Sequence, residues 1–149
     1  MREGHILLIE DDIACQLLIK ESIADFHFYC AENVRDAKNL LLAHQKDLDA
    51  ILLDIHLPDG DGLRLLHELK SGEKTAKIPC LVLSSDNEIS GKVMAFSSGA
   101  EDFILKPFDP IELKVRVLAR IKRAKKVKEE LSVIDVGNLL LDFHRQKAF

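Results

Sequence analysis

The sequence contains no tryptophan and a single tyrosine, so a hydrophobic core must be built mainly from Leu, Ile, Val, Ala and Phe. It also has no run close to the roughly 18 apolar residues that a membrane-spanning helix needs. Acidic residues at Glu10–Asp12 interrupt the first apolar run after a few positions, which is unlike a secretory signal peptide. We therefore expect a cytoplasmic protein with no membrane contact.

Cysteine is scarce too, with three residues at Cys15, Cys30 and Cys80. The number is odd, no pair has C-x-x-C spacing, and the neighbours are apolar. Neither a disulfide framework nor a zinc site has this pattern. We interpret the three as reduced, mostly buried thiols, as is usual in the cytosol.

The residues that are present suit one globular domain of ordinary size and a short extra piece. The chain has 149 residues, of which 47% are hydrophobic and 31% are charged. Its net charge of −4 is too small to indicate a nucleic-acid surface. Six Lys and Arg lie between Arg120 and Glu130, and we interpret them as a solvated last helix that runs into a linker, rather than as a DNA contact.

Short apolar runs alternate with segments in which apolar residues recur at helical spacing, such as Ile13, Leu17 and Leu18. The runs predict five strands, at His5–Ile9, Phe26–Ala31, Ala50–Leu53, Cys80–Leu83 and Asp102–Leu105. The segments predict helices at Ile13–Asp25, Val34–Gln45, Leu63–Lys70 and Glu88–Ser98, and Pro110 can open a last helix. This order predicts an α/β fold, a doubly wound five-stranded parallel sheet with helices on both faces.

In such a sheet, ligands bind at the carboxyl ends of the strands. The first strand is followed by Glu10 and Asp11, and the third is followed by Asp54. Three carboxylates at one edge would repel one another unless a cation lies between them. An all-oxygen site with room for water suits Mg²⁺, which favours a phosphate as a further ligand. The sequence thus predicts a magnesium site at this edge.

Ser84 and Lys106 follow the fourth and fifth strands at the same edge. A transferring phosphoryl group spreads negative charge over three oxygens, which Mg²⁺, the Lys106 ammonium and the Ser84 hydroxyl can bind. Asp54 is then the nucleophile, since an aspartyl phosphate is a known type of covalent intermediate. Taken singly, these residues have ordinary interpretations, with Ser84 as a turn residue, Lys106 as a surface lysine and Asp12 as a helix cap. The specific signal is their joint placement.

Four motifs contain these residues, namely ILLIEDD (6–12), ILLDIHLPDGDG (51–62), IPCLVLSS (78–85) and GAEDFILKPF (99–108). Over about residues 5–124, the chain resembles the receiver domain of response regulators in two-component systems. The resemblance implies a flavodoxin-like receiver fold and a sensor histidine kinase as the partner that donates the phosphoryl group. It also implies that the domain catalyses only its own phosphorylation and dephosphorylation.

The resemblance also assigns roles at the acidic cluster. Asp54 would be the phosphoacceptor, Asp11 would bind Mg²⁺ directly, and Glu10 would act largely through a water. The His56 backbone carbonyl would be a further ligand. Lys106 stands where the family has a lysine before a proline, often joined to it by a cis peptide bond.

Three positions individualise this chain within the resemblance. Phe103 stands where the family has a switch aromatic, often Tyr. Because Phe103 has no hydroxyl, switching would rest on packing alone. Ser84 stands where the family has Thr or Ser. His56 and Asp86 lie two residues after the acceptor and two after Ser84, at positions that tune the phosphoryl lifetime in the family. The alternative for each of these two residues, which the sequence leaves equally open, is an exposed polar side chain without a role.

The last helix carries two apolar stripes, more than one core face requires: Ile111/Val115/Leu118 and Leu113/Val117/Ile121. Charges of both signs lie on the fourth helix, the fifth strand and the last helix, at Lys92, Glu101, Asp102, Glu112, Arg116 and Arg120. We expect phosphorylation to promote a symmetric homodimer through this face, as in the winged-helix class that the chain resembles. The alternative is that both stripes pack inside the monomer and the charges are merely solvated.

Residues 1–124 are thus expected to form the receiver domain, and residues 125–149 do not belong to its pattern. Runs at Leu131–Ile134 and Asn138–Phe143 predict two short strands. They look like the opening strands of a winged-helix DNA-binding domain, which would need roughly 70–80 further residues. DNA would therefore be bound only through a downstream domain that is absent from this chain.

Two other functions remain open from the sequence. We prefer a fragment of a longer regulator, and the alternative is a stand-alone receiver that binds a protein target or relays phosphate. A small phosphatase acting on free substrates is disfavoured, because such enzymes need a second acid near the nucleophile, where this chain has His56, and a covering cap.

Overall fold

The computed structural model describes residues 3–85 and 89–148, and the side chains of these residues except at 89 and 134–148. Five parallel strands form one sheet in the spatial order β2-β1-β3-β6-β7. The strands are Gly4–Ile9 (β1), Phe26–Ala31 (β2), Ala50–Asp54 (β3), Cys80–Ser84 (β6) and Asp102–Leu105 (β7). The helices are Ile13–Ser22 (α1), Val34–His44 (α2), Gly62–Ser71 (α3), Ile89–Ser97 (α4) and Pro110–Ala148 (α5). The predicted doubly wound α/β fold is confirmed.

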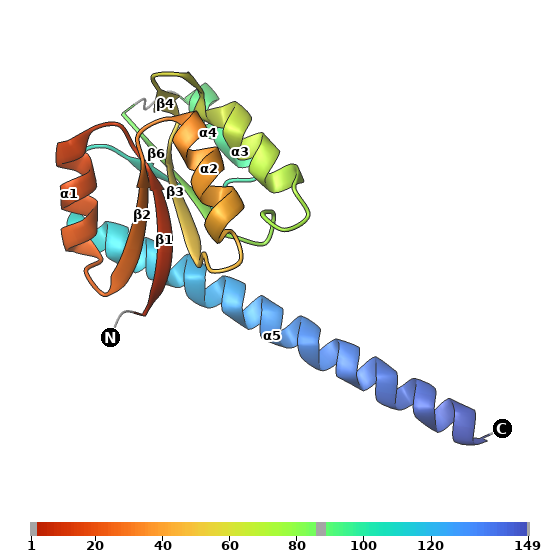
Figure 1. Ribbon diagram of the computed structural model, residues 1–149. Helices are drawn as coiled ribbons and strands as arrows, with labels where there is room; N and C mark the ends of the chain where they lie inside the picture. The colour runs from red at the N-terminus through yellow and green to blue at the C-terminus, as the bar shows by residue number, and fades with distance from the viewer. Residues whose placement is uncertain (1–2, 86–88, 149) are drawn as a thin grey trace.

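Helices cover both faces of the sheet (Figure 1). One core cluster joins the sheet to α2, α3 and α4 through residues such as Leu41, Leu66 and Ala95. A second cluster joins the opposite face to α1 and α5 through residues such as Ile19 and Val117. The central strands β1, β3 and β6 are almost wholly buried, because both of their faces lie under helices. All five strands point their carboxyl ends to the same edge, where the predicted site residues lie.

Side-chain caps fix where the helices begin. Asp12 Oδ1 accepts a hydrogen bond from the Ala14 N–H at 3.0 Å, which confirms Asp12 as the cap of α1. Asn33 and Asp61 cap α2 and α3 in the same way. Asp109 accepts from the Ile111 N–H at 2.8 Å, so it caps α5 directly before Pro110. Each cap satisfies an N–H that the helix leaves without an internal partner.

The apolar residues that signalled α1 are not those that bury it. Ile13, Leu17 and Leu18 are exposed, and α1 instead packs through Ile19, with Gln16 also buried. α4 behaves similarly, because Val93 and Phe96 are exposed while Ala95 is buried. Helical spacing reports a helix correctly in both cases. It does not report which stripe meets the sheet when apolar residues occupy more than one stripe.

A short antiparallel ribbon, which the sequence analysis did not predict, follows β3. It consists of His56–Leu57 (β4) and Gly60–Asp61 (β5), in which His56 pairs with Asp61. Strands of two residues are too short to show an alternating pattern. The Pro58–Asp59 pair between them is a typical turn signal, and it is the feature of the sequence that could have indicated this ribbon.

The chain beyond residue 124 continues α5 as a helix up to Ala148, where two strands were expected at 131–134 and 138–143. The strand expectation is therefore wrong in this structure. A strand pair needs a neighbouring sheet or helix to satisfy and cover its backbone, whereas a helix satisfies its own backbone hydrogen bonds. The assignment of residues 125–149 to a linker and a second domain stays a prediction. Among the described helices, none combines the length and apolar character that crossing a membrane requires.

Candidate functional site

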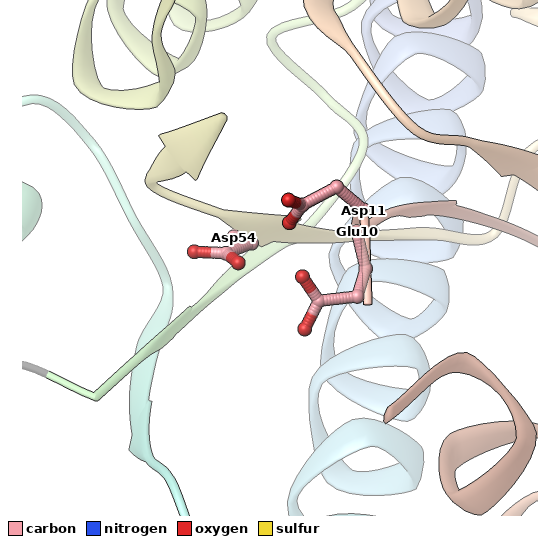
Figure 2. A group of neighbouring side chains, drawn as sticks. All are labelled: Glu10, Asp11 and Asp54. Atoms are coloured by element: carbon pink, nitrogen blue, oxygen red, sulfur yellow. The ribbon is translucent and has the colours of Figure 1, made fainter. Parts of the chain in front are cut away.

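Three carboxylates meet at the carboxyl edge of the sheet, as the sequence predicts. Glu10 and Asp11 directly follow β1, and Asp54 ends β3. The pairing of Ile9 with Leu53 places the two strand ends side by side. One oxygen from each of the three carboxylates lies within 4.8 Å of the others, and Figure 2 shows the groups converging on one point.

Lys106 joins this cluster from the end of β7, the edge strand two positions from β3 in the sheet. It follows β7, and its ammonium contacts Glu10 Oε1 and lies 3.2 Å from Asp54 Oδ2. The peptide bond between Lys106 and Pro107 is cis, as the family resemblance implies. The cluster therefore combines three carboxylates with one ammonium, so negative charge is in excess.

Hydrogen bonds fix the carboxylate of Asp54 and the backbone of Glu10. The His56 N–H donates a hydrogen bond to Asp54 Oδ1 at 2.9 Å, which leaves Oδ2 facing Lys106. The Gln16 side-chain amide donates to the Glu10 carbonyl oxygen at 2.6 Å. Sequence reasoning missed Gln16. Its signal was a polar residue one turn into α1, but the apolar residues around it indicated a different buried face.

The burial and pKa values of the cluster indicate that a cation would stabilise its carboxylates. Glu10 is fully buried, and its Oε2 has no hydrogen-bond partner within the described part of the chain. Burial, and after it the neighbouring Asp54, raises the pKa of Glu10 to about 7. Burial alone would raise the pKa of Asp54 as well, but hydrogen bonds from Glu10 and the His56 N–H, together with Lys106, lower it. For Lys106, burial by itself would lower the pKa of the ammonium. Its contacts with Glu10 and Asp54 outweigh burial, and the pKa of Lys106 is raised.

A hard divalent cation fits this donor set. The unpartnered oxygen of Glu10 and the carboxylates of Asp11 and Asp54 are oxygen ligands only, which is the set that Mg²⁺ prefers. Asp11 is exposed, so water can reach the site and fill the remaining positions. The residues present therefore fit the predicted magnesium ion.

The other site residues lie around this edge at different depths. Ser84 ends β6 and is fully buried, and its carbonyl accepts a hydrogen bond from the Lys106 N–H at 2.8 Å. Phe103 is also buried, on β7. The His56 side chain is exposed beside the acceptor. Asp86 lies outside the described residues, so its proposed role stays a prediction.

The charged face expected to form a dimer is paired internally in this structure. Arg116 lies 3.0 Å from Asp102 and 2.9 Å from Glu112, and Arg120 lies 3.8 Å from Asp102. Glu101 is turned toward the body of the domain, where it contacts Lys70 at 2.6 Å and accepts from the Cys80 N–H. Lys92 and Arg116 instead line a cavity of about 330 Å³ beside Phe103, Phe108 and Glu112.

The two apolar stripes of α5 differ in how far they are buried. Leu113, Val117 and Ile121 are buried against the sheet, and Leu118 is partly buried. Ile111 and Val115 remain 75% and 61% exposed. The alternative in which both stripes pack inside the monomer is therefore wrong, and an apolar centre is available on this face.

Comparison with known proteins is consistent with this geometry. A family model for the response regulator receiver domain matches residues 6–118. The chain is 36% identical, over 90% of its length, to the DNA-binding dual master transcriptional regulator RpaA of a Synechocystis species. It is 35% identical, over 92% of its length, to the phosphate regulon transcriptional regulatory protein PhoB of Pseudomonas aeruginosa. It spans 56% and 59% of the lengths of these two relatives.

Solved structures support the same conclusion about the fold. The phosphorylated cyanobacterial phytochrome response regulator RcpA superposes with a TM-score of 0.68 at 28% identity. The match covers 76% of this chain and 88% of that one. The region matched by the family model contains all three carboxylates of the acidic cluster and its lysine.

Proposed function

Because the chain belongs to the response regulator receiver family, we propose that Asp54 accepts a phosphoryl group from a sensor histidine kinase in a magnesium-dependent reaction. The observation that carries the proposal is the placement of Asp54. Its carboxylate lies among Glu10 and Asp11, with Lys106 3.2 Å away. Among the described residues, no other group of three such side chains has its ligand atoms within 4.8 Å of one another.

The chain's own residues supply the nucleophile and its positioning. The lowered pKa of Asp54 keeps its carboxylate ionised, and the His56 N–H holds Oδ1 while Oδ2 faces Lys106. One carboxylate oxygen attacks phosphorus, the bond from phosphorus to the donor's imidazole nitrogen breaks, and that nitrogen keeps the electron pair and takes a proton. The product is an aspartyl phosphate, whose oxygens Lys106 and the Ser84 hydroxyl bind.

Glu10, Asp11 and Asp54 would hold Mg²⁺, with the His56 carbonyl as a further ligand. When bound, the ion neutralises charge on the phosphoryl oxygens and so lowers the barrier to transfer. The domain has no part in reactions other than its own phosphorylation and dephosphorylation. His56 and Asp86 adjust the rate of the second reaction, a role that the family resemblance implies for both positions. The exposed side chain of His56 supports it for that residue.

Phosphorylation, we propose, then promotes a homodimer through α4, β7 and α5. The exposed Ile111 and Val115 give this face an apolar centre, around which lie Asp102, Glu112 and Arg116. In a symmetric dimer an acid of one subunit can meet a base of the other, so the internal ion pairs of Arg116 can exchange for intermolecular ones. Such pairs add little affinity by themselves, and the apolar centre carries most of it.

The output of this switch is the control of transcription. The relatives RpaA and PhoB are described as a DNA-binding transcriptional regulator and a transcriptional regulatory protein, and both are longer than this chain. We propose that DNA is contacted through a region outside these 149 residues. The described residues also allow the stand-alone alternative, because all five strands of the parallel sheet lie before residue 106 and α5 begins at Pro110.

Intact mass spectrometry tests the acceptor directly. Incubation with Mg²⁺ and a small phosphodonor should add one phosphoryl group to the wild type, and hydroxylamine should remove it. Asp54→Asn should abolish the gain. Asp47→Asn, which changes an exposed carboxylate outside the cluster, is the matched control and should behave as wild type. Phosphorylation of Asp54→Asn at wild-type yield would show that the acceptor lies elsewhere.

A further inference from the structure

A cluster of three histidines surrounds the single tyrosine at the other end of the sheet. His5 on β1 and His27 on β2 are direct partners in the parallel pairing of these strands. Tyr29 stacks on the His44 ring at 4.0 Å between centroids and on the His5 ring at 5.7 Å. His5 lies five residues before Glu10, about 16 Å along the strand, so this cluster is separate from the acidic site.

We propose that His5 and His27 together bind one transition-metal ion of the class that includes Zn²⁺, Cu²⁺ and Ni²⁺. Cross-strand partners on adjacent strands project their side chains from the same face of a sheet. The two ring centroids are 5.4 Å apart at an interplanar angle of 67°. Two imidazoles that share a tetrahedral Zn²⁺ through bonds of about 2.0–2.1 Å have centroids about 5 Å apart. The observed separation of the rings is close to this value, so binding needs no movement of the strands.

The surroundings of the pair favour a bound ion over simple packing. β2 is an edge strand, and the His27 ring is exposed, so an ion and its waters can reach it. His5 is half-buried, and Tyr29 packs on it at 12° and on the edge of His27 at 4.9 Å, which limits the positions of both rings. Limiting a ligand before binding reduces the entropy that binding costs.

The class of ion follows from the ligands. Imidazole suits Zn²⁺, Cu²⁺ and Ni²⁺, whereas Mg²⁺ prefers oxygen. The nearby Asp49 carboxylate accepts a hydrogen bond from the backbone N–H of His5 at 2.8 Å and lies 3.9 Å from the Lys125 ammonium. Asp49 is therefore engaged with groups other than the imidazoles. The remaining positions on the ion are then filled by water. The domain would thus carry a hard-cation site and an imidazole site at opposite ends of β1.

The test uses the whole chain and Zn²⁺ itself, with excess Mg²⁺ present to occupy the acidic cluster. Imidazole ring signals are followed by NMR and assigned with single His→Gln variants. We expect the His5 and His27 signals to shift together and to saturate at one Zn²⁺ per chain. His27→Gln should weaken binding at least tenfold. His67→Gln, which changes an exposed histidine on α3, should leave the affinity unchanged.

Two results would overturn the site. One is that the His5 and His27 signals stay in place while Zn²⁺ binds elsewhere or not at all. The other is that His67→Gln weakens binding as much as His27→Gln, which would indicate scattered surface binding. His27 is exposed, so its replacement leaves the core intact, and thermal unfolding of each variant checks that the fold is retained.

Discussion

Replacing Glu10 by Gln tests whether the three carboxylates are crowded when no cation lies between them. Glu10 is fully buried, and burial together with the neighbouring Asp54 raises its pKa from the ordinary 4.5 to about 7. A rise of this size corresponds to about 3 kcal/mol between the protonated and the ionised side chain. The magnesium-free protein should therefore be markedly less stable when Glu10 is ionised.

The direction of the pH dependence follows from where the proton binds more tightly. The folded protein holds the Glu10 proton more tightly than the unfolded chain does. The stability that this proton contributes is complete below about pH 4.5 and is lost as the pH rises through about 7. Without Mg²⁺, the wild type should lose up to about 3 kcal/mol from this source by pH 8, whereas Glu10→Gln has no proton to lose.

Urea unfolding at pH 5, 6, 7 and 8, in a chelator and again in excess Mg²⁺, measures this difference. In chelator, the free energy of unfolding of Glu10→Gln should exceed that of the wild type increasingly as the pH rises. Mg²⁺ should stabilise the wild type more than the variant, because it binds the folded state and needs the carboxylate. Glu21→Gln, at an exposed glutamate of α1, is the control. Parallel pH profiles for wild type and Glu10→Gln would refute the crowding argument.

Three further changes test other parts of the site. Asp11→Ala removes one of three oxygen ligands and should weaken Mg²⁺ binding at least tenfold in a calorimetric titration, so equal affinities would rule out the proposed site. His56→Ala, alone or with Asp86→Ala, should change the rate of phosphoryl loss measured by intact mass over time. Rates within about twofold, ~0.4 kcal/mol in barrier, would make these side chains bystanders. Arg116→Glu should weaken the dimer that light scattering detects with the phosphoryl mimic beryllofluoride, and a dimer indifferent to both would contradict the proposed face.

The site was largely predictable because it depends on strand ends. A parallel sheet brings the residues after each strand to one edge, so Glu10, Asp11, Asp54 and Lys106 could be placed together without coordinates. What the sequence could not supply is which contacts form there. The amide of Gln16 on the Glu10 carbonyl arises from the rotation of α1 about its own axis, and that rotation is set by packing.

Packing also explains the other differences. α1 and α4 carry apolar residues on more than one stripe, so periodicity alone left their buried faces undetermined until Ile19 and Ala95 met the sheet. In α5, one apolar stripe is buried. The other supplies the exposed Ile111 and Val115, the apolar centre of the proposed dimer face. Residues after 124 were interpreted from a resemblance to strands that need a partner sheet, and α5 continues there as a helix.

The route from the acceptor to the proposed dimer face is short, and it follows contacts that are present in the structure. Ser84 pairs with Leu105 across β6 and β7, so a movement of Ser84 toward a phosphoryl group acts directly on β7. Phe103 lies two residues earlier on that strand, and its carbonyl accepts a hydrogen bond from Arg116 at 3.4 Å. Arg116 also holds Asp102 and borders the 330 Å³ cavity beside Phe103. Because Phe103 has no hydroxyl to fix either position, the proposed switch would rest on how its ring packs, and Arg116 would carry the result to the surface.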